Sequence, residues 1–231
     1  MTIAKGEIYF YNLIKDKCKV IFDVGCRDDI HYIEMSEGKE FHLFEPNLNS
    51  FKKLFENLSK SSLGTTNVIV PNNFGLGDKT VEIDYYENSE SFFYRPQHYA
   101  KTEPVKLKIM SFLQYLYENS IGSIDFLKID TEGYESDILL DGKDFIKEHV
   151  NYVQFEYAST WLDNPNARDI FEIFDVYSTD FNFYFLLDEN HPISKTNQDM
   201  MTPIIDKSTL ELVDNYMRND YGFNIVMELK F

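Results

Sequence analysis

Residues that could do chemistry recur directly after short apolar stretches of this 231-residue chain. Asp130 and Glu132 follow the stretch Ile124 to Ile129, which has the composition of a buried strand. Two neighbouring carboxylates can raise the pKa of one of them toward neutrality, or can jointly hold a divalent cation. We expect Asp130 to act as a general base, with Glu132 supporting it. A divalent metal is compatible with this pair, but no metal ligands are predicted.

Each of these acids also has an alternative role. Asp130 and Glu132 could cap the helix expected to start near Gly133, because carboxylates are favoured at helix N-termini. His98 is a second candidate base, since histidine titrates near neutrality, although a loop histidine often has no such role. Glu156, at the end of another apolar stretch, is either a supporting or metal-binding group or an acid with satisfied hydrogen bonds.

A second set of residues has the spacing of a nucleoside site. Glu45 lies about twenty residues after Gly25, where a carboxylate can accept both ribose hydroxyls, although it could instead be an acid beside the helix that begins at Asn47. Gly25 allows the backbone to approach a ligand closely. The G-x-G-x-x-G pattern of dinucleotide sites is missing, since Arg27 to Asp29 follow the glycine. The carboxylates of Asp28 and Asp29 would repel a pyrophosphate but suit the positively charged amino-acid end of S-adenosylmethionine.

The remaining candidate cofactor contacts lie beside these residues. Asp23 either faces the ligand or accepts local backbone donors. Cys26 and Arg27 belong to the same turn, and we expect the Cys26 thiol to be packed rather than nucleophilic. Asn73 and Phe74 either contact adenine, through an amide and a ring face, or only shape their loop.

Strands connected by helices would bring these residues together. Apolar runs alternate with segments of helical period, which predicts an α/β fold with a mostly parallel sheet and helices on both faces. In such a sheet, ligands bind outside the carboxyl ends of the strands. The seven expected strands are Lys19 to Asp23, Glu40 to Phe44, Asn67 to Val70, Ile124 to Ile129, Tyr152 to Glu156, Phe181 to Leu187 and Phe223 to Leu229.

Helix starts and loops can also be placed. Pro46-Asn47 and the capping box Ser111 to Gln114 each open a helix, and Asn164-Pro165 is expected to open another. A further helix runs from Tyr134 to Leu140 and closes at Gly142. The segment Phe74 to Tyr86 predicts a hairpin around Gly77-Asp78, and residues 88–101 are a candidate lid or substrate loop. Aromatic residues that could stack on a sugar ring are Phe92, Phe93, Tyr94, Tyr99 and Trp161.

Composition limits the classes of partner. The net charge of -17 disfavours nucleic acid, whose binding depends on Lys and Arg contacts to phosphates. The longest apolar run, Phe181 to Leu187, is too short to span a bilayer, and no targeting segment is recognised, so we expect no membrane partner. Cys18 and Cys26 are too few for a disulfide framework, which indicates a cytoplasmic location. We expect one domain over residues 1–231; the oligomeric state is not predicted.

Five segments between about Val20 and Tyr157 together resemble the FkbM methyltransferases, a branch of the class I S-adenosylmethionine-dependent enzymes. The most specific is Lys128-Ile129-Asp130-Thr131-Glu132-Gly133-Tyr134-Glu135. The other segments are Phe22 to Cys26, Phe44 to Asn47, Asn73 to Lys79 and Val153 to Glu156. After the first glycine the family usually has Ala-Asn-x-Gly, where this chain has Cys26-Arg27-Asp28-Asp29.

The resemblance implies a fold, a cofactor and a reaction. It implies a class I sheet with an antiparallel last strand, and S-adenosylmethionine as cofactor. Asp23 and Gly25 would lie near its methionine part, Glu45 on its ribose and Asp130 at the methyl-transfer centre. The implied reaction is O-methylation, with a sugar or glycan hydroxyl as the expected acceptor. Methylation of a small molecule or a protein, or an inactive binding protein on the same fold, are the alternatives.

Overall fold

The computed structural model describes residues 5–61, 66–86, 103–187, 200–219 and 222–230. Its strands are β1 Val20–Val24, β2 Glu40–Phe44, β3 Val68–Asn72, β4 Gly75–Gly77, β5 Val81–Tyr85, β6 Val105–Ser111, β7 Ile124–Ile129, β8 Val150–Tyr157, β9 Phe181–Leu186, β10 Met201–Ile204 and β11 Phe223–Leu229. Its α-helices are α1 Lys5–Ile14, α2 His31–Glu34, α3 Leu48–Lys60, α5 Phe112–Glu118, α6 Glu135–Asp141, α7 Lys143–His149, α8 Ile170–Tyr177 and α9 Lys207–Met217. No helix within these ranges is long and apolar enough to cross a membrane.

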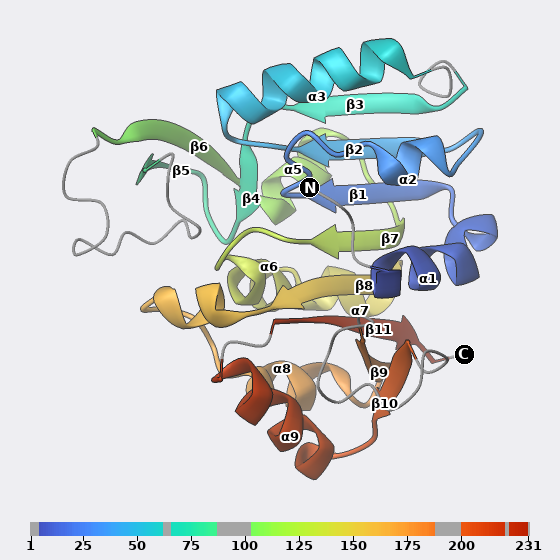
Figure 1. The fold of residues 1–231 in the computed structure, drawn as a ribbon, viewed down its shortest axis with the longest axis vertical. Coiled ribbons are helices and arrows are strands. Elements are labelled where there is room, and N and C mark those ends of the chain that lie inside the picture. The colour runs from blue at the N-terminus through green and yellow to red at the C-terminus, as the bar shows by residue number, and fades with distance from the viewer. Residues whose placement is uncertain (1–4, 62–65, 87–102, 188–199, 220–221, 231) are drawn as a thin grey trace.

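The main sheet has the strand order β10-β9-β11-β8-β7-β1-β2-β3 (Figure 1). Neighbouring strands from β3 to β8 in this order are parallel. By contrast, β11 is antiparallel to both β8 and β9, and β10 is antiparallel to β9. The prediction of a mostly parallel sheet whose last strand is antiparallel is confirmed. All seven expected strands are present, and β10 is an addition at the edge.

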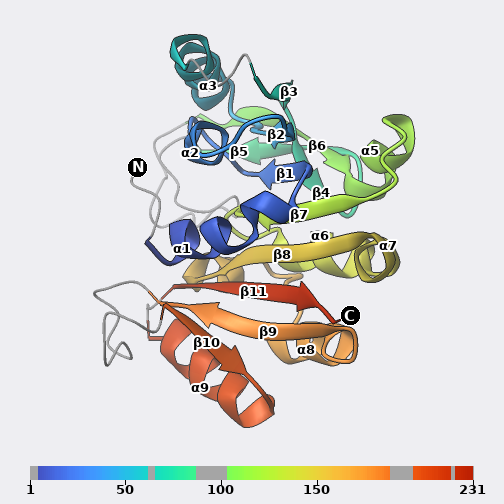
Figure 2. The same cartoon turned by 90° about the vertical axis from the view of Figure 1, so that its right-hand side faces the viewer.

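Helices cover both faces of this sheet (Figure 2). On one face, α1, α2 and α3 bury apolar side chains such as Phe10, Ile33 and Leu54 against the strands. On the other, helices α5 to α9 bury a larger set, including Leu139 and Val213. Alternate strand residues therefore serve opposite cores, as the pleat of a strand requires. Helices α1, α2, α7 and α9 have no counterpart among the helices expected from the sequence.

Two of the expected helix starts are capped as the sequence indicates. The Asn47 side chain accepts hydrogen bonds from the backbone N–H groups of Asn49 and Ser50, and Ser111 accepts one from Gln114. A third start is wrong. Helix α8 begins after Asp169, whose side chain caps it, rather than at Asn164. A 3₁₀ turn, Ser159–Asp163, occupies the chain just before Asn164.

The expected hairpin at residues 74–86 is also wrong. Strands β4 and β5 do not pair with each other; β6 lies between them, parallel to β4 and antiparallel to β5. The two glycines of β4 allow it to lie close to β6, because a Cβ on Gly75 or Gly77 would come within 2.9 Å of the Ile109 side chain of β6. The small sheet lies beyond the carboxyl ends of the parallel strands (Figure 1).

The turn after β1 depends on a glycine for steric reasons. Gly25 has a φ of +84°, and a Cβ there would lie 1.7 Å from the carbonyl oxygen of Asp130. Its backbone N–H donates to the carbonyl oxygen of Phe44 at 2.9 Å. The space beside Gly25 is thus occupied by the loop after β7. Because Gly25 has no side chain, the carboxyl ends of β1, β2 and β7 can lie close together.

We predict that Gly25→Ala destabilises the fold by more than about 4 kcal/mol, because the new methyl group meets backbone and the residue is strained at positive φ. Gly122→Ala is the matched control, since a Cβ at this exposed glycine meets nothing within 4 Å. Urea unfolding followed by circular dichroism measures both variants. Equal stabilities of the two variants would contradict the packing described for Gly25.

Candidate active site

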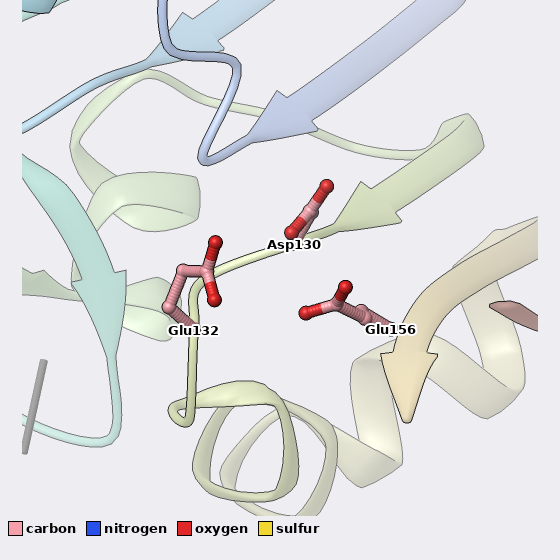
Figure 3. Close-up of side chains that lie close together, drawn as sticks. All are labelled: Asp130, Glu132 and Glu156. Atoms are coloured by element: carbon pink, nitrogen blue, oxygen red, sulfur yellow. The ribbon is translucent and has the colours of Figure 1, made fainter. Parts of the chain in front are cut away.

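The predicted catalytic acids lie together at the carboxyl ends of β7 and β8. Ligand oxygens of Asp130, Glu132 and Glu156 all lie within 4.8 Å of one another. Asp130 and Glu132 come from the loop after β7, and Glu156 points toward them from β8 (Figure 3). All three side chains are half-buried. The strand-end rule therefore places the two residues of the sequence motif beside an acid from a separate segment.

Glu156 lies in an unfavourable electrostatic environment. Burial, followed by the neighbouring charges of Asp130 and Glu132, raises the pKa of Glu156 well above its usual value. Its Oε2 is buried and has no hydrogen-bond partner among the described residues. Among the described residues, this oxygen lacks the hydrogen bond that a locally satisfied acid would have, and the supporting or metal-binding role of Glu156 stays a prediction. A buried carboxylate of this kind requires a proton or a cation.

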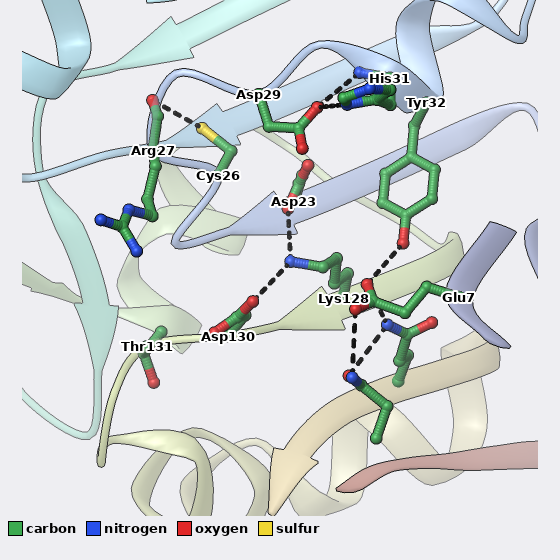
Figure 4. A network of polar contacts seen from close by, with 12 residues as sticks. Glu7, Asp23, Cys26, Arg27, Asp29, His31, Tyr32, Lys128, Asp130 and Thr131 are labelled. Atoms are coloured by element: carbon green, nitrogen blue, oxygen red, sulfur yellow. Dashed lines mark hydrogen bonds and ion pairs between the residues drawn. The ribbon is translucent and has the colours of Figure 1, made fainter. Parts of the chain in front are cut away.

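A buried lysine holds the other side of the cluster. Lys128 Nζ lies 3.1 Å from Asp130 Oδ2 and 3.6 Å from Asp23 Oδ1 (Figure 4). Burial lowers the pKa of Lys128, but the carboxylates of Asp130, Asp23 and Glu7 raise it well above its usual value, so the ammonium stays charged. The Asp130 side chain is 32% exposed, against 9% for Lys128. Asp130 thus faces outward from a buried ion pair.

Sheet register explains why these charges meet. Lys128 on β7 is directly opposite Asp23 on β1 and Gln154 on β8, so the three side chains form a row on one face. Helix α1 covers this row with Glu7, whose Oε2 accepts from Gln154 Nε2 at 2.9 Å. Glu7 Oε1 accepts from Asn224 Nδ2 at 3.1 Å. The N-terminal helix is therefore fixed to the sheet by polar contacts.

Asp23 is a member of this row whose hydrogen bonds are incomplete. Its Oδ1 is buried and lacks a hydrogen-bond partner among the described residues, although the Lys128 ammonium is close. Burial raises the pKa of Asp23 to about 6. A hydrogen-bond donor on a ligand, such as an ammonium group, would satisfy Asp23 Oδ1.

The loop between β7 and α6 is organised by Glu135, and not by Asp130 or Glu132, for which helix capping was the alternative role. Glu135 accepts hydrogen bonds from the Thr131 backbone N–H at 2.7 Å, the Thr131 hydroxyl at 2.9 Å and the Gly133 N–H at 3.0 Å. Burial raises the pKa of Glu135 to about 7. Glu132 sits in this loop at a φ of +57°, and Gly133 at +123°. This tight turn carries Glu132 into the cluster.

Glu45 closes β2 at the same edge of the sheet. Its side chain is buried, and Oε1 accepts a hydrogen bond from the Asn47 backbone N–H at 2.6 Å. Burial raises the pKa of Glu45 to about 7, although backbone N–H groups of Asn47 and Arg27 oppose the shift. The carboxylate therefore supports the start of α3, as the alternative role has it. Its position at the strand end leaves the ribose prediction standing.

The other predicted cofactor contacts surround this point. Cys26 is buried, and burial raises the pKa of its thiol well above the usual value, which fits a packed residue. Arg27 is exposed in the same turn, at a φ of +54°. Asn73 Nδ2 donates to the backbone oxygens of Glu45 and Pro46 at 2.9 and 3.2 Å.

Phe74 is partly buried, and its ring packs 6.0 Å from both the Phe44 and the Tyr115 ring. Asn73 and Phe74 thus shape their loop through these contacts. A contact of either residue with adenine stays a prediction.

Comparison with protein families identifies the family to which this chain belongs. A model of the FkbM methyltransferase domain matches residues 23–187, the greater part of the chain. The chain belongs to the FkbM family of S-adenosylmethionine-dependent methyltransferases. Among proteins with curated descriptions, none matches the sequence significantly.

One of the similar solved structures supports the fold. A candidate rRNA methylase from Clostridium thermocellum is 9% identical and aligns over 100% of both chains with a TM-score of 0.51, which supports the class I methyltransferase fold. An FkbM methyltransferase from Methylobacillus flagellatus KT is 15% identical, with a TM-score of 0.49 over 72% of this chain. This chain spans 39% of that protein's chain. The human METTL16 N-terminal domain, solved with SAH, is 11% identical, with a TM-score of 0.49 over 97% of this chain and 69% of its own.

Some predicted residues of this FkbM protein are not part of the site or cannot be placed. Trp161 was expected at an aromatic rim, but it is 3% exposed and packs against Phe155 and Tyr157 in the core. His98 lies outside the described residues. So do residues 88–101 as a candidate lid, with the aromatic side chains expected there.

Lys128, Glu7 and Glu135 are not identified individually from the sequence. A lysine between Leu127 and Ile129 of a mostly apolar strand is itself a signal of a paired buried charge, because an unpaired one is too costly. Glu7 has a weaker signal, since Phe10 and Ile14 follow it at helical spacing.

We predict that Lys128→Met costs about 3–5 kcal/mol of stability at pH 8, because it leaves Asp23 and Glu7 buried without their counter-charge. Acids whose pKa is raised by folding bind more protons in the folded state. Stability is therefore highest below their unfolded pKa near 4 and falls as pH rises toward 7. The variant should show this fall more steeply than the parent chain between pH 5.5 and 8 in thermal melts.

Lys147→Met is the control for this prediction. Lys147 pairs with Asp180 at 3.2 Å, but both side chains are about a third or more exposed, at 32% and 42%. Loss of this ion pair should lower the free energy of unfolding by less than about 1 kcal/mol at both pH 5.5 and pH 8. Equal effects of the two substitutions, or a Lys128→Met loss that does not depend on pH, would contradict the central role of Lys128.

Proposed function

We propose that this protein transfers a methyl group from S-adenosylmethionine to a hydroxyl group of a sugar or glycan. The observation that carries the proposal is the convergence of Asp130, Glu132 and Glu156 beside Lys128 at the strand ends of a family fold made for methyl transfer.

The strand ends fit the cofactor by their charge. S-adenosylmethionine carries a sulfonium and an ammonium, and the described residues present Asp23, Glu45 and the acid cluster at this edge. Asp23 has a buried oxygen without a hydrogen-bond partner there. Glu45 would orient the ribose, and Asp23 would face the methionine part. A pyrophosphate-containing dinucleotide would be repelled by the same acids.

Asp130 is the residue that we assign to the acceptor. When bound, the cofactor supplies a methyl group that is activated by its sulfonium. The acceptor hydroxyl would bond to the methyl carbon while the carbon–sulfur bond broke with its electron pair on sulfur, and the Asp130 carboxylate would take the hydroxyl proton. Lys128 fixes the orientation of Asp130 through the 3.1 Å ion pair. Glu132 would accept a hydrogen bond from the acceptor and hold its hydroxyl in line.

A carbohydrate acceptor is supported by the family resemblance and by one observation. The resemblance to FkbM enzymes implies methylation of hydroxyl groups, often on sugars. The edge beside Asp130 is rich in carboxylates, which accept hydrogen bonds from several hydroxyls at once. The net charge of -17 argues against a nucleic-acid acceptor.

The test is an acceptor screen with donor labelled in the methyl group. We predict that label enters a glycan or a free sugar and is stable to mild base, as an ether is and an ester is not. Asp130→Asn should lower the transfer by about 100-fold or more while cofactor binding persists. Asp144→Asn, a change in an acid of helix α7 that is not part of the cluster, serves as the control and should leave the transfer unchanged.

The outcomes separate the possible acceptors. Label in protein but not in glycans would overturn the sugar proposal and favour a protein acceptor. Label in small molecules that carry no sugar would overturn it in favour of a small-molecule acceptor. Cofactor binding without any transfer, across all three classes, would indicate a binding protein.

A further inference from the structure

The three acids of the cluster are close enough to share one ion. Their ligand oxygens all lie within 4.8 Å of one another. Two oxygens that bind the same Ca²⁺ at about 2.4 Å are at most about 4.8 Å apart, and around Mg²⁺ the limit is about 4.2 Å. Each pair of oxygens lies within the first limit, and binding of one ion by all three would draw the side chains closer together.

Glu156 gives an independent indication that something binds here. Its Oε2 is buried without a hydrogen-bond partner in the part of the chain that the structure describes. Figure 3 shows its carboxylate directed at Asp130 and Glu132 from the neighbouring strand. Lys128 does not fill this role, since its ammonium donates a hydrogen bond to Asp130 and forms ion pairs with Asp130 and Asp23. Glu135 is likewise occupied by the loop after β7.

We propose that Asp130, Glu132 and Glu156 form a binding site for one hard divalent cation, of the class of Mg²⁺, Mn²⁺ and Ca²⁺. Carboxylate oxygens are the ligands that these ions prefer, and two positive charges offset the repulsion among three neighbouring acids. Cysteine and histidine are not part of the cluster, so the donor set does not favour zinc.

The site would deepen the proposed methyl transfer, on which this step rests. A hydroxyl oxygen that binds a divalent cation loses its proton more readily. The cation would therefore hold the acceptor at the same place where Asp130 takes the proton. Acceptors with two neighbouring hydroxyls, as in sugars, would bind such an ion through both oxygens.

Cation binding can be measured without cofactor or acceptor. We would titrate the full chain with Mn²⁺, follow free Mn²⁺ by electron paramagnetic resonance, and compete with Mg²⁺ and Ca²⁺. The expected result is one saturable site with a Kd below about 1 mM. Glu156→Gln, which keeps the shape and removes one charge, should weaken binding by about 10-fold or more. Circular dichroism confirms that each variant is folded.

Glu148→Gln is the control, because Glu148 is exposed and lies outside the cluster. It should bind Mn²⁺ as the parent chain does. Asp130→Asn combined with Glu156→Gln should abolish the saturable site. No saturable binding at millimolar Mn²⁺, or binding that Glu156→Gln and the double variant leave unchanged, would overturn the cation site. Because cation binding is measured without cofactor or acceptor, methyl transfer that needs no added cation would leave the binding result unchanged. The cation site and the proposed methyl transfer can therefore be overturned independently of each other.

Discussion

The buried ammonium of Lys128 is the interaction on which the rest of this edge depends. It lies in a row across β1, β7 and β8, and the carboxylates of Asp23, Asp130 and Glu7 surround it. Burying such acids would cost several kcal/mol each without a counter-charge. Because Lys128 supplies one, the sheet can present acids at its strand ends and still fold. Helix α1 is drawn into the same arrangement through Glu7.

The position of Lys128 separates the residues of this edge into groups with different proposed roles. Gly25 lets the loop after β1 meet the loop after β7, which brings Asp23 and Asp130 to the same lysine. Toward β2, Glu45 stands at the place proposed for a ribose contact. Toward β8, Glu156 completes an acidic cluster with Asp130. In the proposed function, cofactor and acceptor would therefore lie on separate sides of the Lys128 ion pair.

The sequence predicts most of the main sheet because apolar runs and helix caps are local signals. Asn47 and Ser111 cap the helices that they were expected to cap. The errors arise where distant segments decide: β6 separates β4 from β5, and Trp161 turns into the core. The site shows the same pattern. Strand-end acids are visible in the sequence, but Glu7 reaches Lys128 only through the packing of α1, which spacing alone does not reveal.

We propose that this edge of the sheet binds S-adenosylmethionine through Glu45, and isothermal titration calorimetry with the cofactor tests this most directly. We predict saturable binding at one site per chain, weakened about 10-fold or more by Glu45→Ala. Glu56→Ala, which changes an exposed acid of the adjoining helix α3, should leave binding unchanged. No saturable binding at millimolar cofactor, or equal binding by Glu45→Ala, would contradict the claim.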